Sequence, residues 1–481
     1  MQAANDNAGE RGRNGASAGA SPARPLVQKF GGTSVGDAAA MRAAAELVRA
    51  ASPQPVLVVL SAMARVTDEL LALARLAASG AAQPAEELRL RLMERHRVTA
   101  EELFATRVPE DLARDFEEQG AELARLLAAL HGGSGKPASA RQLDAIAGLG
   151  ERLSTRVFAR YLRHLGAAAE LVDAGAVLVT DDAFGAAAPR FERIATLARE
   201  HFAPRLAPGR IVVTQGYVGR SEAGEPTTLG RGGSDYSAAI FGAALGASEI
   251  QIWTDVEGVL TADPRRVERA RPIAQLSAAE AGELAAFGAK VLHPATIHPA
   301  VEAGIPVTVR HTRRPSGRFT TITKNGSSGR DVVAIASRGP IHVITASSPR
   351  MLQQAGFLAR LFEVFARRRV SVDLVATAEL SVSLTVEHEA PVRSLAEEIA
   401  AFAEVSVAEE RAIVAVVGER LKRTRGVCTR VFDALAEMPI ELISMGANEI
   451  NLSVVVERKL EQDVVRRLHA ALIESEGGGE R

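Results

Sequence analysis

The stretch that most constrains the fold is a strand, a glycine turn and a helix near the start of the chain. The apolar run Leu26–Val27 leads into Lys29-Phe30-Gly31-Gly32-Thr33-Ser34-Val35-Gly36, and a helical pattern begins near Asp37. Paired glycines let backbone N–H groups approach a ligand closely, and a helix N-terminus favours an anion. Lys29 would add a point charge for phosphate. By itself this pattern fits a phosphate site and an ordinary turn about equally.

Length, composition and net charge limit the classes of protein to which this chain can belong. The chain has 481 residues, of which 47% are hydrophobic, and this length predicts about three domains. A net charge of −1 gives no sign of nucleic-acid binding. The one cysteine, Cys428, is interpreted as a buried structural residue and fits a reducing compartment. Because no apolar run approaches the ~18 residues of a membrane span, we expect a cytoplasmic protein without a membrane partner.

Residues 1–24 carry almost no large apolar side chain, so we expect a disordered N-terminal tail. The apolar core of a signal peptide is missing there. The acidic residues Asp6 and Glu10 make an organelle transit peptide the weaker interpretation.

Strand and helix patterns alternate from Leu26 to His311, as in α/β proteins. The run Pro55–Leu60 is continuously apolar after its proline, which is typical of a strand buried on both faces. Thr67 to about Leu130 reads as successive helices, which we expect to form a helical lobe. Further strands are expected at 170–172, 176–179, 210–214 and 249–253.

Two glycine-rich segments follow the lobe. The segment His131–Lys136 looks like a phosphate loop, but Pro137 stands where such a loop needs Ser or Thr, so we expect a linker. A long helix comes next and contains Gly148-Leu149-Gly150-Glu151. Since glycines inside a helix cost stability, we expect another segment or a ligand to approach closely there.

A second glycine cluster, Thr228–Asp235, opens a helix that runs to about Leu245. Its Arg231 offers a planar fork suited to a carboxylate. Polar clusters such as Thr254–Asp255 fall at strand ends, where ligands of open α/β sheets bind. His293 and His298 have the wrong spacing for a helical metal pair, so no metal ligand from a protein side chain is predicted.

Four motifs in order resemble those of the aspartate kinases of the amino-acid kinase family, most closely the monofunctional, lysine-regulated type. They are KFGGTSV at Lys29–Val35, GRGGSD at Gly230–Asp235, WTDV at Trp253–Val256 and FGAKVLHP at Phe287–Pro294. The resemblance implies a three-layer αβα sandwich of the carbamate-kinase-like type with an eight-stranded, largely parallel sheet. That catalytic domain would cover 25–312, with a helical insertion at about 67–135.

From about Val332 the sequence turns to alternating strands that repeat: Phe362 matches Phe432, and Glu379 matches Glu449. This indicates two βαββαβ units. The second unit lacks a strand, which the segment 332–336 could supply, so that the first unit would be inserted in the second. The resemblance implies α+β ferredoxin-like ACT domains at 338–410 and at 331–337 plus 411–475. The alternative is a small α+β domain used only for dimerisation.

The resemblance implies transfer of the γ-phosphoryl group of ATP, with Mg²⁺, to the side-chain carboxylate of L-aspartate, giving 4-phospho-L-aspartate for lysine, threonine and methionine biosynthesis. Lys29 and Asp235 would be the catalytic residues. The implied nucleotide site is Lys29, Gly31, Gly32, Ser34, Gly233, Thr254, Asp255, Leu260, Arg265 and Lys290. The implied aspartate site is Ser61, Thr67, Glu151, Arg231, Gly232 and Ser234, with Arg231 on the α-carboxylate and Glu151 on the ammonium group.

Several alternatives stay open at this point. Leu260 stands where the family often has a tyrosine near the adenine, which puts that side-chain contact in doubt. Glu151 could be a solvated helix residue, and Arg265 and Lys290 could be surface charges. Phosphorylation of glutamate or acetylglutamate is a second function, and a catalytically silent amino-acid sensor is a third. The paired repeat units argue against phosphorylation of glutamate or acetylglutamate, and the intact Lys29 and Asp235 argue against a catalytically silent sensor.

The resemblance further implies inhibition by L-lysine at the first repeat unit, in an ACT interface of a homodimer or a dimer of dimers. The expected effector residues are Met351, Gly356, Phe357, Leu358, Val372, Asp373, Thr377 and Glu379. Asp373 corresponds to Ile443 of the second unit, so only the first should bind. Gln354 and Ala378 stand where that type usually has serines, so the effector could differ, and Asp373 and Glu379 could be solvated strand charges.

Overall fold

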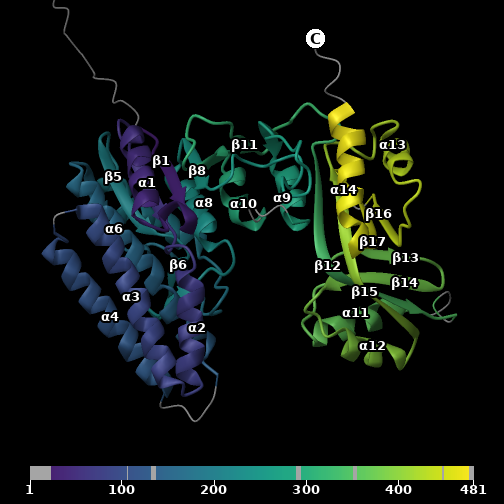
Figure 1. Ribbon diagram of the computed structural model, residues 1–481, viewed down its shortest axis with the longest axis horizontal. Helices are drawn as coiled ribbons and strands as arrows, with labels where there is room; N and C mark the ends of the chain where they lie inside the picture. The colour runs from purple at the N-terminus through teal and green to yellow at the C-terminus, as the bar shows by residue number, and fades with distance from the viewer. Residues whose placement is uncertain are drawn as a thin grey trace, which may run out of the picture.

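The computed structural model describes residues 23–105, 107–131, 137–288, 294–349, 351, 355–446 and 449–475. An N-terminal half built on an eight-stranded sheet lies beside a C-terminal half built on a six-stranded sheet (Figure 1). Within these ranges no helix is long and apolar enough to cross a bilayer. The loop expected at 132–136, most of the expected tail, Lys290, His293 and Gln354 lie outside the described residues.

The eight-stranded sheet has the strand order β3-β5-β2-β1-β8-β10-β11-β9. Every neighbouring pair is parallel except β10 and β11, so the expected largely parallel sheet is confirmed. The strands are β1 (Leu26–Phe30), β2 (Val56–Leu60), β3 (Ala168–Leu171), β5 (Arg210–Gln215), β8 (Glu249–Thr254), β9 (Gln275–Ser277), β10 (Val307–His311) and β11 (Thr320–Thr323).

Helices cover both faces of this sheet, and β2 shows why. Val56, Val58 and Leu60 belong to a core shared with α1 (Ala38–Ala51) and α6 (Leu149–His164). Leu57 and Val59 belong to a second core, shared with α7 (Phe191–His201), α8 (Gly233–Leu245) and α10 (Pro294–Glu302). Since side chains alternate between the faces of a strand, a continuous apolar run is what this three-layer arrangement requires.

The expected helical lobe consists of α2 (Val66–Ala78), α3 (Ala82–Phe104) and α4 (Glu110–His131), which extend from one end of the N-terminal half (Figure 1). The long helix expected after it is two helices, α5 (Ala140–Ala147) and α6, which meet at Gly148. A Cβ atom on Gly150 would lie 2.7 Å from the Cβ of Ala62, so the predicted close approach is confirmed. This approach seats the first turn of α6 against the end of β2.

The strand expected at 176–179 is mostly wrong. A short turn, η2 (Ala174–Ala176), occupies its start, and only β4 (Val179–Thr180) pairs, in a small sheet with β6 (Val218–Ser221) and β7 (Pro226–Thr228). The Asp173 side chain accepts a bond from the N–H of Gly175 at 3.4 Å, and Gln215 Oε1 accepts one from the N–H of Ala174 at 2.6 Å. These two bonds turn the chain, and an apolar pattern cannot reveal them.

The six-stranded sheet has the order β13-β14-β12-β15-β17-β16. Its strands are β12 (Ala334–Ser347), β13 (Val375–Thr377), β14 (Ser381–Glu387), β15 (Glu404–Val417), β16 (Leu442–Met445) and β17 (Asn451–Glu457). Its helices are α11 (Phe357–Arg367), α12 (Val392–Ala400), α13 (Val427–Ala434) and α14 (Glu461–His469), the last followed by the π-turn η6 (Ala470–Glu474). A further helix, α9 (Ala278–Ala286), lies between the two sheets (Figure 1).

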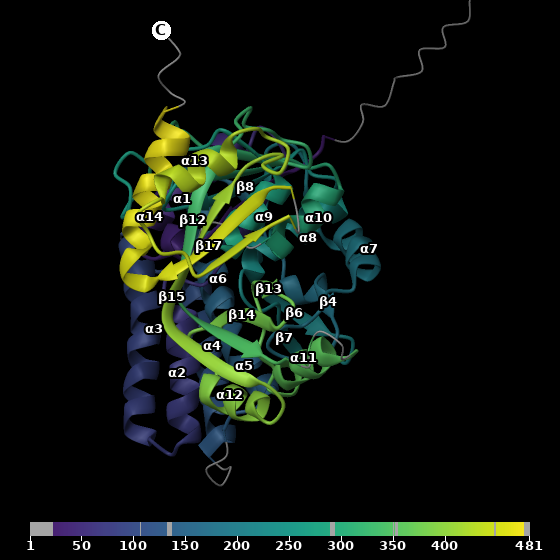
Figure 2. The same ribbon diagram turned by 90° about the vertical axis from the view of Figure 1, so that its right-hand side faces the viewer.

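Two long strands join the repeat units. Residues 334–338 of β12 pair with 413–417 of β15, whereas residues 341–347 pair with β14 and with the first part of β15. The upstream segment therefore supplies a strand to the second unit, and the same strand continues into the first. Figure 2 shows β12 and β15 running through both units.

Arg24 does not belong to the expected tail. Its Nε donates to the carbonyl oxygen of Gly246 and its Nη2 to that of Ala247, each at 2.7 Å. Gly246 is the C-cap of α8, where carbonyl groups lack partners within the helix and favour a cation.

Replacing Arg24 by alanine should therefore lower the free energy of unfolding by about 1 kcal/mol. That loss corresponds to a fall in melting temperature of about 2–4 °C, whereas the matched variant Arg13→Ala, in the expected tail, should leave the melting temperature unchanged. Thermal melts of both variants test this, and equal melting temperatures would contradict a docking role for Arg24.

Candidate active site

The centre of the site is an ion pair at the end of β1. Lys29 Nζ lies 2.6 Å from Asp235 Oδ1, and both side chains are largely buried. Asp235 stands in the first turn of α8, so the pair joins the first glycine motif to the second. A Cβ atom on Gly31 would come within 3.4 Å of Lys29 Nζ, so glycine there keeps the amine accessible.

Ser34 joins the ends of two neighbouring strands. Its Oγ donates to the carbonyl oxygen of Trp253 at 3.1 Å and lies 2.7 Å from Thr312 Oγ1. Trp253 is on β8 and Thr312 follows β10, so the hydroxyl ties the first glycine turn to two neighbouring strands. Its hydroxyl proton is used within the protein, so the backbone N–H groups of this turn are the donors that the turn can offer a ligand.

The second glycine loop is shaped by left-handed backbone. Gly230 has φ = 73° and Gly232, the N-cap of α8, has φ = 72°. These values place the first N–H groups of α8 at the cavity described next, where they favour an anion. Arg231 lies between the two glycines and is exposed, and none of the described residues forms an ion pair with it.

A cavity of about 610 Å³ brings the two motifs together. Every residue predicted for the aspartate site lines it, as do Lys29, Gly32, Gly233 and Asp235. The remaining lining residues are Ala62, Met63, Ala64, Arg65, Asp68, Leu71, Gly185, Tyr217 and Gly230. Residues from the first glycine motif, the segment after β2, α6 and the second glycine motif thus meet at the carboxyl ends of β1 and β2.

Glu151 is the buried acid of this cavity, with 3% of its surface exposed. Its Oε1 accepts a bond from the N–H of Ala62 at 3.1 Å, and its Oε2 has no hydrogen-bond partner among the residues that the structure describes. Burial raises the pKa of this carboxyl to about 8. The alternative of a solvated helix residue is therefore wrong. An unsatisfied buried carboxylate oxygen beside a cavity suits an incoming cation such as an ammonium group.

Asp144 hydrogen-bonds two segments next to the loop that carries Arg231. Its Oδ2 accepts bonds from the N–H groups of Gly185 at 2.9 Å and Thr228 at 3.0 Å, and its Oδ1 accepts from Thr228 Oγ1 at 2.8 Å. Burial raises the pKa of Asp144, and these three bonds oppose that shift. Because Thr228 stands two residues before Gly230, Asp144 holds the start of the arginine loop in place.

Two lining residues missed at the sequence level have unusual backbone. Arg65, the N-cap of α2, has φ = 67°, and Tyr217 has φ = 65°. Such values are rare for residues other than glycine and cluster at functional sites. A bond from the N–H of Tyr217 to Ser237 Oγ at 2.9 Å helps to hold one of them. Only the folded backbone reveals this signal.

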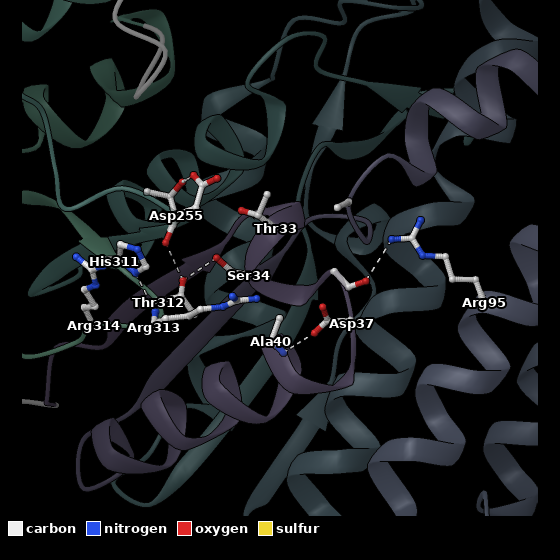
Figure 3. A pocket seen from close by; sticks show the side chains of 13 residues that line it. Thr33, Ser34, Asp37, Ala40, Arg95, Asp255, His311, Thr312, Arg313 and Arg314 are labelled. Atoms are coloured by element: carbon white, nitrogen blue, oxygen red, sulfur yellow. Dashed lines mark hydrogen bonds between the residues drawn. The ribbon is translucent and has the colours of Figure 1, made fainter. Parts of the chain in front are cut away.

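The expected nucleotide residues separate into two groups. Thr254 and Asp255 line a second cavity of about 640 Å³ beside Ser34 (Figure 3). Leu260 and Arg265 line neither cavity, and the guanidinium of Arg265 is mostly exposed and pairs with Asp263 at 2.7 Å. The structure does not bring these two to the others, because their segment is packed against the C-terminal half.

Hydrogen bonds within and between the surrounding helices shape the second cavity. Asp37 caps α1 by accepting a bond from the N–H of Ala40 at 2.7 Å, and Arg95 of α3 donates to the carbonyl oxygen of Gly36 at 3.2 Å (Figure 3). Its remaining lining residues are Thr33, Ala64, His311, Thr312, Arg313 and Arg314. It shares Ala64 with the first cavity, so the two adjoin. No group of three or more possible metal ligands occurs among the described residues.

The expected effector residues fall in two segments, one at the start of α11 and one from Val372 to the turn after β13. Gly356 is its N-cap with φ = 91°, Phe357 is buried and Leu358 is exposed. Met351 and Val372 are half-buried, whereas Thr377 and Glu379 are exposed. Asp373 is not free, since its Oδ2 lies 2.5 Å from Nη2 of Arg338 on β12. The alternative of Asp373 as a solvated strand charge is therefore wrong, and an effector cation would have to compete with Arg338.

Chemically, the first cavity suits a small zwitterion, with Arg231 for a carboxylate and Glu151 for an ammonium group. Lys29, two glycine turns and a helix N-terminus next to it suit a phosphate. Such an arrangement is that of a kinase acting on a small molecule.

Comparison with known proteins agrees with this class. The amino acid kinase family model matches residues 24–311 and an ACT domain model matches 414–472. Lysine-sensitive aspartokinase 3 of Escherichia coli is 38% identical over 457 residues, which cover 93% of this chain and 99% of that protein. Chloroplastic aspartokinase 1 of Arabidopsis thaliana is 34% identical over 466 residues, 93% and 80% of the two chains.

Solved structures give the same result. The structure of E. coli aspartokinase III in complex with aspartate and ADP (R-state) is similar with a TM-score of 0.80 and 37% identity, covering 93% of this chain and 99% of that chain. Its form in complex with lysine and aspartate (T-state) has a TM-score of 0.78 with the same identity and coverage. This chain therefore belongs to the amino acid kinase family and, within it, to the aspartokinases, as its motifs predicted.

The buried Glu151 should make the ligand-free protein less stable as pH rises. Its folded-state pKa of about 8 lies above the ordinary value of 4.5 for a glutamate side chain. Between these values the unfolded state releases a proton that the folded state keeps, so the unfolding free energy falls by up to about 1.4 kcal/mol per pH unit.

Urea unfolding from pH 5 to pH 8 tests this with Glu151→Gln, which should flatten the pH dependence. The control is Glu192→Gln, which removes an exposed first-turn acid of α7 and should leave the dependence unchanged. Parallel curves for wild type and Glu151→Gln would show that Glu151 is ionised in the free protein.

Proposed function

We propose that this chain transfers the γ-phosphoryl group of ATP to the side-chain carboxylate of L-aspartate, giving 4-phospho-L-aspartate and ADP. The observation that carries the proposal is the cavity in which Lys29, Asp235, Arg231 and Glu151 meet. The similar E. coli aspartokinase III was solved in complex with aspartate and ADP, which supports the same pair of ligands here.

In this proposal the protein holds the substrate by the two charged groups on its α-carbon. Arg231 binds the α-carboxylate through its planar fork, and Glu151 binds the ammonium group, which supplies the partner that Oε2 lacks. Ser61, Thr67, Gly232 and Ser234 form the remaining wall. Held at this end, the amino acid presents its side-chain carboxylate to the phosphate side of the cavity. The one-methylene difference between aspartate and glutamate would then decide whether that carboxylate reaches the phosphorus.

The reaction needs no general base, because a carboxylate is already ionised at neutral pH. A carboxylate oxygen attacks the γ-phosphorus, the new P–O bond forms, and the bond to the β,γ-bridging oxygen breaks so that ADP leaves. Two anions must approach each other, so catalysis consists mainly of positioning and charge neutralisation. Lys29 provides the cation at the phosphoryl group, Asp235 orients Lys29, and N–H groups of Gly31, Gly32 and Gly233 add donors.

We propose that Mg²⁺ is bound together with the nucleotide, since Mg²⁺ sites commonly use substrate phosphate oxygens as ligands. Asp235 already pairs with Lys29, so the nucleotide's phosphates would hold the ion, and the ion would lower the negative charge that Lys29 must neutralise. Of the expected nucleotide residues, Ser34, Thr254 and Asp255 line the second cavity, where the nucleotide would lie, and Lys290 would complete its site.

The test of the proposed function is trapping of the acyl phosphate. Hydroxylamine converts an acyl phosphate to a hydroxamate, so wild-type protein with ATP and Mg²⁺ should give a hydroxamate from L-aspartate and little from L-glutamate or acetylglutamate. An equal yield from glutamate would favour the second function, and no product from any amino acid would favour a sensor.

Lys29→Met should lower kcat by about 10²–10³, the cost of removing one preorganised group that stabilises transition-state charge. The matched control is Lys324→Met, because Lys324 is exposed and, among the described residues, pairs only with Glu302 on the surface. Steady-state rates at saturating ATP and aspartate measure both. A loss smaller than threefold in Lys29→Met would remove Lys29 from the mechanism.

We further propose that an amino acid, L-lysine, binds the first repeat unit and inhibits the enzyme. The E. coli relative is described as lysine-sensitive and was solved with lysine, which supports this effector. Asp373 would exchange Arg338 for an ammonium group of the effector. Glu379 is exposed and free to meet a second ammonium group, which lysine has and threonine lacks.

A second copy of the chain is the proposed partner of these units. Exposed apolar side chains gather on their helices and edge strands, namely Leu358 and Phe362 on α11, Val375 on β13, Phe432 on α13 and Ile443 on β16. Apolar side chains at unpaired edges are suited to burial against another copy. A homodimer or a dimer of dimers through these units follows, in a cytoplasmic enzyme.

Calorimetric titration should give heat with L-lysine for wild type and much less for Asp373→Ala, because the ammonium group loses its carboxylate partner. The matched control is Ile443→Ala, at the equivalent position of the second unit, and it should bind lysine like wild type. If lysine gives no heat with wild type, or if Asp373→Ala remains fully inhibited, the effector assignment is wrong.

A further inference from the structure

Arg65, which the proposed reaction does not use, lies in the turn between β2 and α2 with a backbone conformation that arginine rarely adopts. Its φ is 67°, in the left-handed region where a Cβ atom crowds the carbonyl oxygen that follows. Glycine or asparagine would occupy such a position at lower cost. Because backbone strain of this kind gathers at functional sites, we expect the arginine side chain to contribute something that glycine could not.

Contacts on both sides of Arg65 hold this backbone in place. The N–H of Val66 donates to the carbonyl oxygen of Met63 at 3.0 Å, and the N–H of Glu69 donates to that of Arg65 at 2.9 Å. A Cβ atom on Gly150 of α6 would lie 3.1 Å from Cγ1 of Val66, so α6 packs tightly against the turn. These contacts fix the direction in which the Arg65 side chain leaves the backbone.

Arg65 lines the first cavity, the one that contains Arg231 and Glu151. The residue before it, Ala64, lines both cavities. A Cβ atom on Gly32 would lie 3.3 Å from Cα of Ala64, so the first glycine turn packs directly against this junction. Arg65 therefore lies on the amino-acid side of the site, next to the junction at which the two proposed substrates would meet.

The charges that line the first cavity leave Arg65 without a partner. Its guanidinium is exposed and forms no ion pair or hydrogen bond with any residue that the structure describes. Lys29 pairs with Asp235, and Arg231 is the proposed partner of the α-carboxylate. Asp68 also lines the cavity, but it stands in the first turn of α2, where the helix N-terminus stabilises a carboxylate. Among the described lining residues, Arg65 is the cation that remains for the side-chain carboxylate of an amino acid.

We propose that Arg65 is a specificity-determining residue that binds the side-chain carboxylate of L-aspartate. The inference rests on the proposed function, in which Arg231 and Glu151 hold the opposite end of the substrate. The guanidinium donates to one oxygen of this carboxylate, and the other oxygen attacks the γ-phosphorus of ATP. The oxygen that Arg65 holds becomes the carbonyl oxygen of the acyl phosphate, so it can accept the bond before and after the transfer.

This contact distinguishes L-aspartate from L-asparagine. The two amino acids share the α-carboxylate and the ammonium group, and they differ in the charge of the side chain. A guanidinium binds a carboxylate through charge-assisted hydrogen bonds, which are about twice as strong as bonds to a neutral acceptor. The side-chain NH₂ group of asparagine would in addition face a second donor, because arginine has no acceptor to offer it.

The test compares the binding of these two amino acids to the full-length chain by calorimetry, with L-asparagine titrated in competition with L-aspartate. The variants are Arg65→Gly and Arg65→Asn, because glycine and asparagine both tolerate the left-handed backbone and should preserve the wild-type melting temperature. The matched control is Arg369→Gly, since Arg369 is an exposed arginine with a φ of 54° that lines neither cavity.

In both Arg65 variants the Kd for L-aspartate should rise about tenfold, the effect of losing one hydrogen bond between charged groups. The Kd for L-asparagine should stay unchanged, and Arg369→Gly should match wild type for both amino acids. By contrast, Arg231→Gln should weaken both amino acids, because both carry the α-carboxylate. In steady-state assays of the Arg65 variants, the KM for aspartate should rise and the KM for ATP should stay unchanged.

Three results would overturn the inference: an unchanged Kd for L-aspartate in both Arg65 variants, an equal rise for both amino acids, or an equal rise in both KM values. The second result would show that Arg65 only shapes the cavity, and the third that it binds the nucleotide as well. Failure of the proposed function is distinguishable from these. If wild type forms no hydroxamate from aspartate, the activity itself is wrong, whereas the two Kd values still measure whether Arg65 recognises the side-chain charge.

Discussion

The site depends on one constraint, the parallel pairing of β1 with β2 on one side and β8 on the other. Both faces of these strands are buried in different cores, so a shift of one residue would move apolar side chains to the wrong layer. The register fixes where β1 ends, and it therefore fixes Lys29 against the first turn of α8. The ion pair with Asp235 is a consequence of this register.

Unfavourable features gather around the cavity that this register creates. Glu151 is buried with one oxygen unsatisfied, and Arg65 and Tyr217 have left-handed backbone. Each costs stability, and each persists because the surrounding structure holds it, as Asp144 holds the loop of Arg231. A cavity that is costly when empty and complementary to a charged ligand is what a preorganised substrate site requires.

The two halves are less separate than their sequence patterns indicate. The strands β12 and β15 serve both repeat units, and residues of the catalytic half complete the core of the second unit. Ala262 and Val267 pack there because the segment between β8 and β9 has its own apolar side chains to bury. The catalytic half and the second repeat unit consequently share a packed apolar surface.

By itself the sequence determined the elements with strong local signals: the doubly buried strand β2, the two glycine turns and the repeat. These follow from periodicity and from backbone freedom, which act over a few residues. Only the tertiary structure decided which distant group each polar side chain meets. Glu151 accepts a bond from the N–H of Ala62, Asp144 accepts one from Thr228, and Asp373 pairs with Arg338. The physical reason is that such partners lie far apart along the chain. Several groups could pair with each side chain, and only the packing of the whole fold decides which of them comes within reach.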